Sequence, residues 1–157
     1  MKIILSSNSP RRKELLAGLG VDFEVRVLKG VDERYPDDIP LNEVPLYIAI
    51  EKASAYTVAK DELVVTADTV VIVDNEILGK PKDRAEAYGM LRKISGKTHQ
   101  VVTGVCLTTI DDQRSFTVTT DVEFKELSDN EIYYYIDKYR PFDKAGAYGI
   151  QEWIGYV

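Results

Sequence analysis

Residues 63–73, LVVTADTVVIV, form the most β-branched run of the chain and decide its fold class. Valine, isoleucine and threonine favour strands, and an almost unbroken apolar run indicates a strand that is buried on both faces. The run therefore predicts a central strand. On its N-terminal side, residues 2–5 read as a second buried strand that leads directly into a helix over residues 10–19. Strands that alternate with helices in this way predict an α/β fold.

The remaining elements are expected from hydrophobic periodicity and from capping residues. The return of residues 76–78 after the Asp74-Asn75 turn is expected to be antiparallel, and a Ser128/Glu131 capping box predicts the last helix. Residues 140–157 read as a loop followed by the start of a strand. Besides the elements above, strands are expected over residues 22–27, 99–109 and 115–124, and helices over residues 46–60, 84–94 and 128–138. No repeat or linker appears, so residues 1–157 are expected to form one domain.

Asp68 interrupts the central strand with a carboxylate between Thr66 and Thr69. A carboxylate inside a core strand costs free energy unless it is paired, hydrogen-bonded or bound to a metal. Asp68 is therefore either a salt-bridged structural residue or a functional acid at the edge of a cleft.

Composition excludes several classes of protein. The chain has 157 residues, of which 45% are hydrophobic and 29% charged, with a formal net charge of −6. An acidic chain lacks the broad basic face of a protein that binds duplex nucleic acid or an anionic membrane. The single cysteine, Cys106, cannot form an intrachain disulfide and reads as a packed strand residue. Without a secretory signal or an apolar run of about 20 residues, a cytoplasmic location is expected.

Residues 6–12, SSNSPRR, connect the first strand to the first helix and place two arginines at a helix start. Ser9 and Pro10 suit the N-cap and the first helical position whatever the function is. Arg11 and Arg12 have the same sign as this end of the helix dipole, so they do not stabilise the helix. They are either exposed structural residues or part of a phosphate cradle made of backbone N–H groups, hydroxyls and guanidiniums.

Other charged residues could complete a phosphate site. Glu33 lies in an acidic loop, Lys52 on the second helix and Lys80 in a Gly-Lys-Pro turn. With Asp68, they form the usual inventory for metal-assisted phosphate chemistry, although exposed loop acids and lysines are often merely solvated. The only histidine, His99, gives little support to a zinc site or a catalytic triad and is expected to be a polar partner at a strand start.

Five stretches, in this order and spacing, make the chain resemble the Maf family over essentially its whole length. They are SSNSPRRKELL (6–16), EKA (51–53), TADTVV (66–71), GKPKDRAEAYGMLRKISGKTHQVVTGV (79–105) and FDKAGAYGIQ (142–151). The resemblance implies a Maf- and ITPase-like elongated mixed sheet flanked by helices, with two lobes and a central cleft. It also implies hydrolysis of a nucleoside triphosphate to the monophosphate and pyrophosphate, which serves to clean nucleotide pools. A divalent metal, Mg or Mn, is implied as cofactor.

The resemblance also implies roles for individual residues. Asp68 matches the catalytic acid, which binds metal or activates water, and Glu33 matches the acid that joins it at the metal. The residues that match substrate-binding positions are Ser7, Ser9, Arg11, Arg12, Lys52, Thr69, Lys80 and Gln151. Among these, Arg11, Thr69 and Gln151 mark the branch that prefers dTTP and UTP.

Two departures from the family pattern accompany the resemblance. Glu152 stands where members usually have glycine, and the family's C-terminal strand and helix are expected to be lacking. An alternative function is a nucleotide-binding regulator of septum formation that does not hydrolyse its ligand. Retention of Asp68, Glu33 and both lysines favours the enzyme. The expected partner is a nucleoside triphosphate, with no nucleic acid and no membrane; a homodimer is left open.

Overall fold

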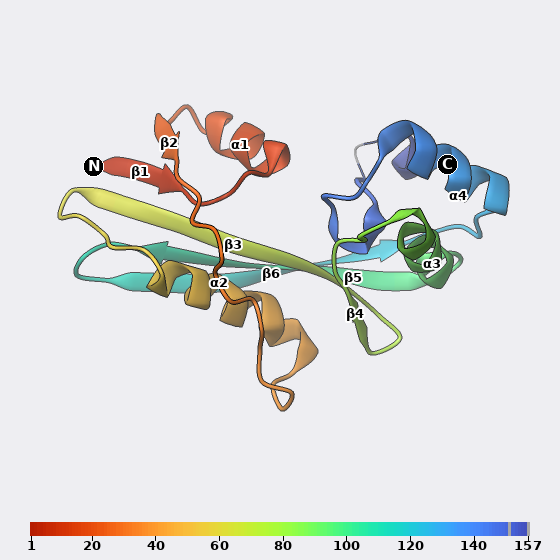
Figure 1. Ribbon diagram of the computed structural model, residues 1–157, viewed down its shortest axis with the longest axis horizontal. Helices are drawn as coiled ribbons and strands as arrows, with labels where there is room; N and C mark the ends of the chain where they lie inside the picture. The colour runs from red at the N-terminus through yellow and green to blue at the C-terminus, as the bar shows by residue number, and fades with distance from the viewer. Residues whose placement is uncertain (151, 157) are drawn as a thin grey trace. The chain divides into compact units, whose positions relative to one another are not determined.

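The computed structural model describes residues 1–150 and 152–156, and its strands and α-helices are labelled in Figure 1. The strands are β1 (Lys2–Leu5), β2 (Phe23–Val25), β3 (Glu62–Val73), β4 (Glu76–Leu78), β5 (Thr98–Thr108) and β6 (Gln113–Glu123). The α-helices are α1 (Pro10–Ala17), α2 (Val44–Ser54), α3 (Arg84–Ile94) and α4 (Asp129–Tyr139). Three 3₁₀ helices, η1 (Leu41–Glu43), η2 (Ala145–Ala147) and η3 (Trp153–Tyr156), complete the described part of the chain.

The strands form one mixed sheet in the order β2-β1-β3-β5-β6, with β4 also paired to β3. β1 runs parallel to both β2 and β3, in a register that places Ile4 opposite Val64. β4 returns antiparallel to β3, as expected. Residues 109–112 alone connect β5 to β6, and a connection this short joins antiparallel strands. The expected α/β fold with a mixed sheet flanked by helices is confirmed.

The chain divides into two compact units. Unit 1 consists of residues 1–68 and 103–118, and unit 2 of residues 69–102 and 119–157. β3, β5 and β6 each contribute residues to both units. Unit 1 holds α1 and α2, while unit 2 holds α3 and α4.

In unit 1, α2 is seated on the sheet by close backbone packing and one buried hydrogen bond. Thr66 on β3 donates its hydroxyl to the carbonyl oxygen of Ala49 at 2.7 Å. Ala49 and Ala53 pack against Cys106, which is therefore the packed strand residue that the sequence predicts. Small side chains at this contact let the helix approach the strands closely.

Gly104 on β5 also depends on this close approach, because a Cβ atom there would lie 2.4 Å from Leu46 N and 2.5 Å from Leu46 Cα. Since those are backbone atoms, Gly104→Ala must displace the first turn of α2 and is expected to cost about 1–3 kcal/mol of stability. A Cβ atom at Gly89, inside α3, would meet nothing within 4 Å. Gly89→Ala is therefore expected to stabilise the protein by about 0.5–1 kcal/mol. Urea unfolding of both variants tests these opposite signs; a Gly104→Ala variant as stable as the wild type would contradict the packing.

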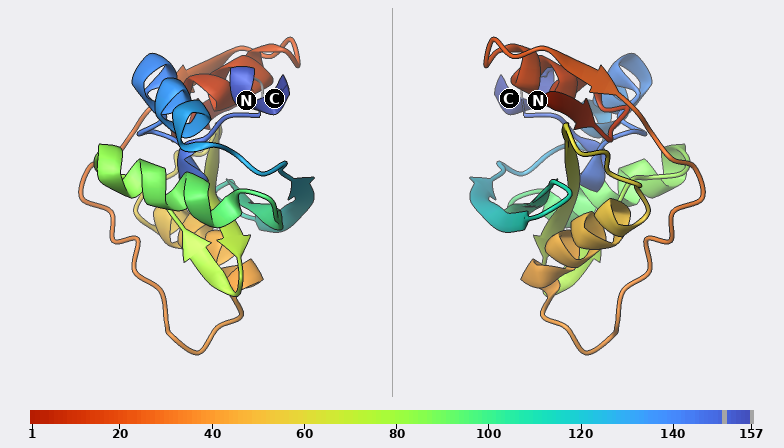
Figure 2. Two further views of the ribbon diagram at one scale, coloured as in Figure 1. Left: turned by 90° about the vertical axis from the view of Figure 1, so that its right-hand side faces the viewer. Right: turned by 90° about the vertical axis from the view of Figure 1, so that its left-hand side faces the viewer.

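In unit 2, α3 and α4 pack on one hydrophobic core. Figure 1 and the left-hand view of Figure 2 show the two helices side by side. Their fully buried side chains include Leu91 and Ile94 of α3 and Ile132 of α4. His99 is buried in the same unit, with its Nε2 atom 2.6 Å from the Tyr148 hydroxyl. Burial lowers the pKa of His99, so the neutral ring is a polar partner, as expected.

Several expected element bounds differ from the structure: α1 ends at Ala17 rather than at residue 19, and β2 spans only Phe23–Val25 rather than residues 22–27. The helix expected over residues 46–60 spans Val44–Ser54, because Pro45 suits the first turn and the β-branched residues Thr57 and Val58 disfavour continuation. The expected C-terminal strand is replaced by η2 and η3 within the described residues. In η3, Gly155 N donates to the carbonyl oxygen of Glu152 at 2.9 Å, which closes a 3₁₀-type turn.

None of the helices over residues 1–150 and 152–156 is both long enough and apolar enough to cross a membrane.

Candidate active site

The turn between β1 and α1 is held by its own serines. Ser9 is the N-cap of α1, and its hydroxyl oxygen accepts the Arg12 backbone N–H at 3.3 Å. The buried Ser7 hydroxyl oxygen accepts the Ser9 backbone N–H at 3.1 Å. Both serines therefore shape the turn, and Ser9 fulfils the capping role expected whatever the function.

The Arg12 guanidinium turns inward from this helix start. Its Nη1 atom donates to Ser7 Oγ at 3.4 Å and to the carbonyl oxygen of Ala67 at 3.3 Å. Burial lowers the pKa of Arg12, while the nearby carboxylates Asp68 and Glu33 act in the opposite direction. An arginine cannot lose its proton near neutral pH, so this is a partly desolvated cation beside the central strand.

Lys52 reaches the same place from α2. Its Nζ atom lies 3.1 Å from Glu33 Oε1 and 3.6 Å from Asp68 Oδ1, and it donates to Ala67 O at 3.1 Å. The Thr66–Ala49 hydrogen bond explains this placement, since Lys52 lies almost one turn after Ala49 on the helix that this bond fixes. The side chain of Lys52 is only 18% exposed.

Asp68 is the less exposed acid of the group, with its side chain 17% exposed, whereas Glu33 is 59% exposed. Burial raises the pKa of Asp68, and the like charge of Glu33 acts in the same direction. Lys52 and Arg12 oppose this shift, but burial dominates. The pKa of this carboxyl group is therefore shifted toward the range in which the carboxylate can accept a proton near neutral pH.

We define the site cluster as Ser7, Arg12, Glu33, Lys52 and Asp68, all of which belong to unit 1. It combines two cations with two carboxylates around one backbone carbonyl. No group of three or more histidine, cysteine or acidic side chains able to hold a metal occurs among the described residues. Mg²⁺ commonly binds one or two carboxylates together with substrate phosphates. The two carboxylates of the cluster therefore fit an ion that is shared with the substrate better than one held by protein ligands alone.

The other predicted site residues are not members of this cluster. Arg11 is exposed on α1. Thr69 is half-buried directly after Asp68 on β3, and Lys80 is exposed just after β4; both belong to unit 2. Gln151 lies outside the described residues.

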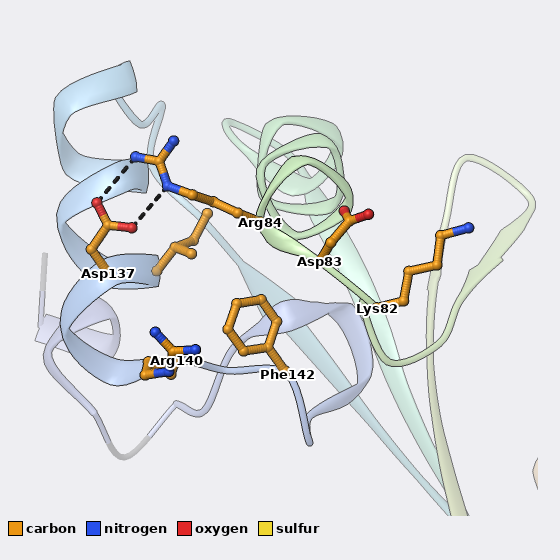
Figure 3. A pocket seen from close by; sticks show the side chains of 7 residues that line it. Lys82, Asp83, Arg84, Asp137, Arg140 and Phe142 are labelled. Carbon is orange, nitrogen blue, oxygen red and sulfur yellow. Dashed lines mark hydrogen bonds and ion pairs between the residues drawn. The ribbon is translucent and has the colours of Figure 1, made fainter.

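Unit 2 has a hollow of its own, of about 300 Å³, between the start of α3 and the end of α4 (Figure 3). Its charged lining is largely paired internally, because Arg84 donates to Asp137 at 2.9 and 3.1 Å. Asp83 is also engaged, since its carboxylate caps α3 by accepting Glu86 N–H at 2.8 Å. Of the predicted site residues that the structure describes, none lines this hollow.

Sequence reasoning missed one functional group of the cluster, the carbonyl oxygen of Ala67. It accepts hydrogen bonds from both Arg12 and Lys52 and so holds the two cations together. A backbone carbonyl has no side-chain signal. The only available signal is its position, directly before the acid of the strand.

Three comparisons place the chain among known proteins. The sequence profile of a family described as "Maf-like protein" matches residues 2–157. A dTTP/UTP pyrophosphatase of Phocaeicola vulgatus and one of Bacteroides thetaiotaomicron are each 61% identical over 158 residues, covering 99% of this chain and 82% of the relative. The Staphylococcus aureus Ham1 protein aligns with a TM-score of 0.50 at 16% identity, over 78% of this chain and 71% of that one. This likeness supports the fold alone.

Proposed function

Because the chain belongs to the Maf-like protein family, we propose that it hydrolyses dTTP and UTP to the monophosphate and pyrophosphate and so cleans nucleotide pools. The observation that carries the proposal is the site cluster, in which two partly buried cations flank a partly buried acid whose pKa is raised. Relatives named dTTP/UTP pyrophosphatase support the choice of nucleotide.

Arg12 and Lys52 are the proposed phosphate-binding groups. A guanidinium offers a planar fork of donors and an ammonium a compact charge, and both suit phosphate oxygens. The two heads lie within hydrogen-bond distance of the same carbonyl oxygen. They are therefore close enough to contact neighbouring phosphoryl groups of one triphosphate. Both side chains are already held in place before the ligand binds, which lowers the entropic cost of binding.

Asp68 is the proposed base. The water oxygen attacks the α-phosphorus, the bond to the bridging oxygen breaks, and pyrophosphate leaves while Asp68 takes the proton of the water. The raised pKa favours this role, because a base is most effective when its pKa is near the working pH.

Glu33 and Asp68 would hold the divalent cation, Mg or Mn, that we propose as cofactor. When bound, such an ion neutralises developing negative charge on the phosphates. In the free protein, the Lys52 ammonium lies beside both carboxylates and offsets the repulsion between their negative charges.

Base choice is expected to depend on Thr69 and Gln151, through a hydroxyl and an amide. A site built on such hydrogen bonds rejects a mismatched base because buried polar groups are left unpaired. Hydrolysis of dTTP and UTP is therefore expected to exceed that of ATP and GTP. The test is a pyrophosphate-release assay across these four nucleotides with Mg²⁺ and with Mn²⁺. Equal kcat/KM for purines and pyrimidines would contradict the base preference, and no release from any of them would contradict the function.

We further propose a cytoplasmic setting, where nucleoside triphosphates are made and used. A homodimer stays a prediction, for which sedimentation of the purified protein is the direct test.

A further inference from the structure

The Tyr56 hydroxyl is the centre of a hydrogen-bond group in unit 1. It donates to the carbonyl oxygen of Arg26 at 2.9 Å and accepts the backbone N–H of Leu28 at 3.1 Å. The Ser6 hydroxyl is also within hydrogen-bond distance. A phenol has one proton to donate, and the Tyr56 hydroxyl donates it to the carbonyl oxygen of Arg26. The Ser6 hydroxyl must therefore be the donor in the third bond. The hydrogen-bonding capacity of the phenol is thereby filled.

Each of these partners belongs to a segment that delivers part of the site cluster. Ser6 directly precedes Ser7 and the turn that aims Arg12. Leu28 lies near the start of the long connection, residues 26–40, that carries Glu33. Tyr56 itself lies two residues beyond the end of α2, the helix that carries Lys52. One phenol oxygen thus joins the three segments that bring phosphate-binding and acidic groups to Asp68.

The long connection particularly needs such an anchor. Residues 26–40 contain no helix or strand, and most of their side chains are exposed. Glu33 is 59% exposed, so burial does little to place it. The backbone contacts of Arg26 and Leu28 with Tyr56, together with the bond from Arg26 N to Leu5 O at 3.0 Å, fix where this connection leaves the sheet.

We propose that Tyr56 is a positioning residue for catalysis, acting through its hydroxyl group on the phosphate turn and on the connection that carries Glu33. The proposal rests on the proposed pyrophosphatase function. Tyr56 does not itself belong to the site cluster. Its effect is to hold Ser7, Arg12 and Glu33 at fixed distances from Asp68 and Lys52, and small displacements of such groups lower the rate strongly.

The test compares Tyr56→Phe with Tyr88→Phe in the full chain. Both substitutions keep the ring and remove a hydroxyl, but the Tyr88 hydroxyl donates to Asp129 on the exposed side of unit 2, at 2.7 Å. With dTTP as substrate, Tyr56→Phe is expected to lower kcat/KM by about 10- to 100-fold. Tyr88→Phe is expected to stay within about twofold of the wild type, because its hydroxyl contacts Asp129 and not a member of the site cluster.

Two further measurements separate positioning from general loss of stability. Amide hydrogen exchange at Leu28 is expected to accelerate in Tyr56→Phe and to stay unchanged in Tyr88→Phe, because only the first loses the acceptor of that N–H. Ser6→Ala releases the phosphate turn but leaves both bonds to residues 26–28. It is expected to raise KM for dTTP more than it lowers kcat.

The outcomes are distinct. Accelerated exchange at Leu28 with kcat/KM at the wild-type level would overturn the positioning role. Unchanged exchange at Leu28 would overturn the hydrogen-bond anchor itself. If Tyr56→Phe does not fold, Ser6→Ala decides, and wild-type kinetics in that variant would overturn the proposal. If the wild type releases no pyrophosphate, the proposed function fails, whereas Leu28 exchange still reports on the anchor.

Discussion

Replacement of Asp68 by asparagine is expected to lower turnover of dTTP by at least about 100-fold and up to about 10,000-fold, the range that positioned general-base catalysis contributes. Asparagine keeps the shape of the side chain but cannot accept the proton of the attacking water, and it is a poorer metal ligand. Binding should survive, because Ser7, Arg12 and Lys52 remain in place. The measurement is nucleotide affinity by calorimetry, together with pyrophosphate release.

The same variant should not be less stable than the wild type. Burial raises the pKa of Asp68 in the folded state, so the neutral form is favoured on folding. The stability that this group contributes is present at low pH and is lost as pH rises from its unfolded value through the folded one, so the ionised form costs stability at neutral pH. Asparagine removes that cost. A midpoint of unfolding at or above that of the wild type would show that lost turnover is not lost structure.

The pH profile gives an independent check on Asp68. If it is the base, kcat/KM of the wild type should rise with pH through a pKa above the ordinary aspartate value, and this limb should vanish in Asp68→Asn. Unchanged turnover in the variant would contradict the catalytic assignment.

Arg12→Ala is the second substitution expected to have a large effect. A charge-assisted hydrogen bond to a phosphate contributes about 1.5–3 kcal/mol, which corresponds to roughly 10- to 150-fold in kcat/KM for dTTP. Stability should change little, because the guanidinium is partly desolvated at a helix start whose dipole has the same sign. The measurement is steady-state kinetics beside thermal unfolding.

Two matched variants sharpen this comparison. Arg12→Lys keeps the charge but loses the planar fork, so it should recover part of the affinity. Arg114→Ala removes an exposed cation of the same unit, whose side chain is 83% exposed, and should leave kinetics unchanged. An Arg12→Ala variant that unfolds while its activity per folded molecule stays normal would mean that Arg12 is structural.

The sequence predicts the scaffold of the site well, for identifiable reasons. The strand over residues 63–73 has one dominant signal, a β-branched run, and β3 spans Glu62–Val73. Ser9 and Pro10 define a helix start through local hydrogen bonding alone, and α1 begins at Pro10. Asp68 stands out because a charge in such a strand needs partners, which Lys52 and Arg12 supply.

What the sequence does not predict depends on tertiary contact. Arg11 and Arg12 cannot be told apart by residue type, yet Arg12 donates to Ala67 O whereas Arg11 is exposed. The reason is helix geometry, which turns neighbouring side chains by about 100°. The hydrogen bonds of Tyr56 with Ser6 and with residues 26–28 involve partners far along the chain. Periodicity carries no information about such contacts.

The products formed from dTTP test the central claim most directly. ³¹P NMR of dTTP incubated with the protein and Mg²⁺ or Mn²⁺ distinguishes cleavage at the α-phosphorus from cleavage at the γ-phosphorus. The expected result is loss of the triphosphate signals with matching growth of dTMP and pyrophosphate, and no dTDP. Formation of dTDP with orthophosphate, or a triphosphate that binds but stays intact with either metal, would contradict the proposed pyrophosphatase.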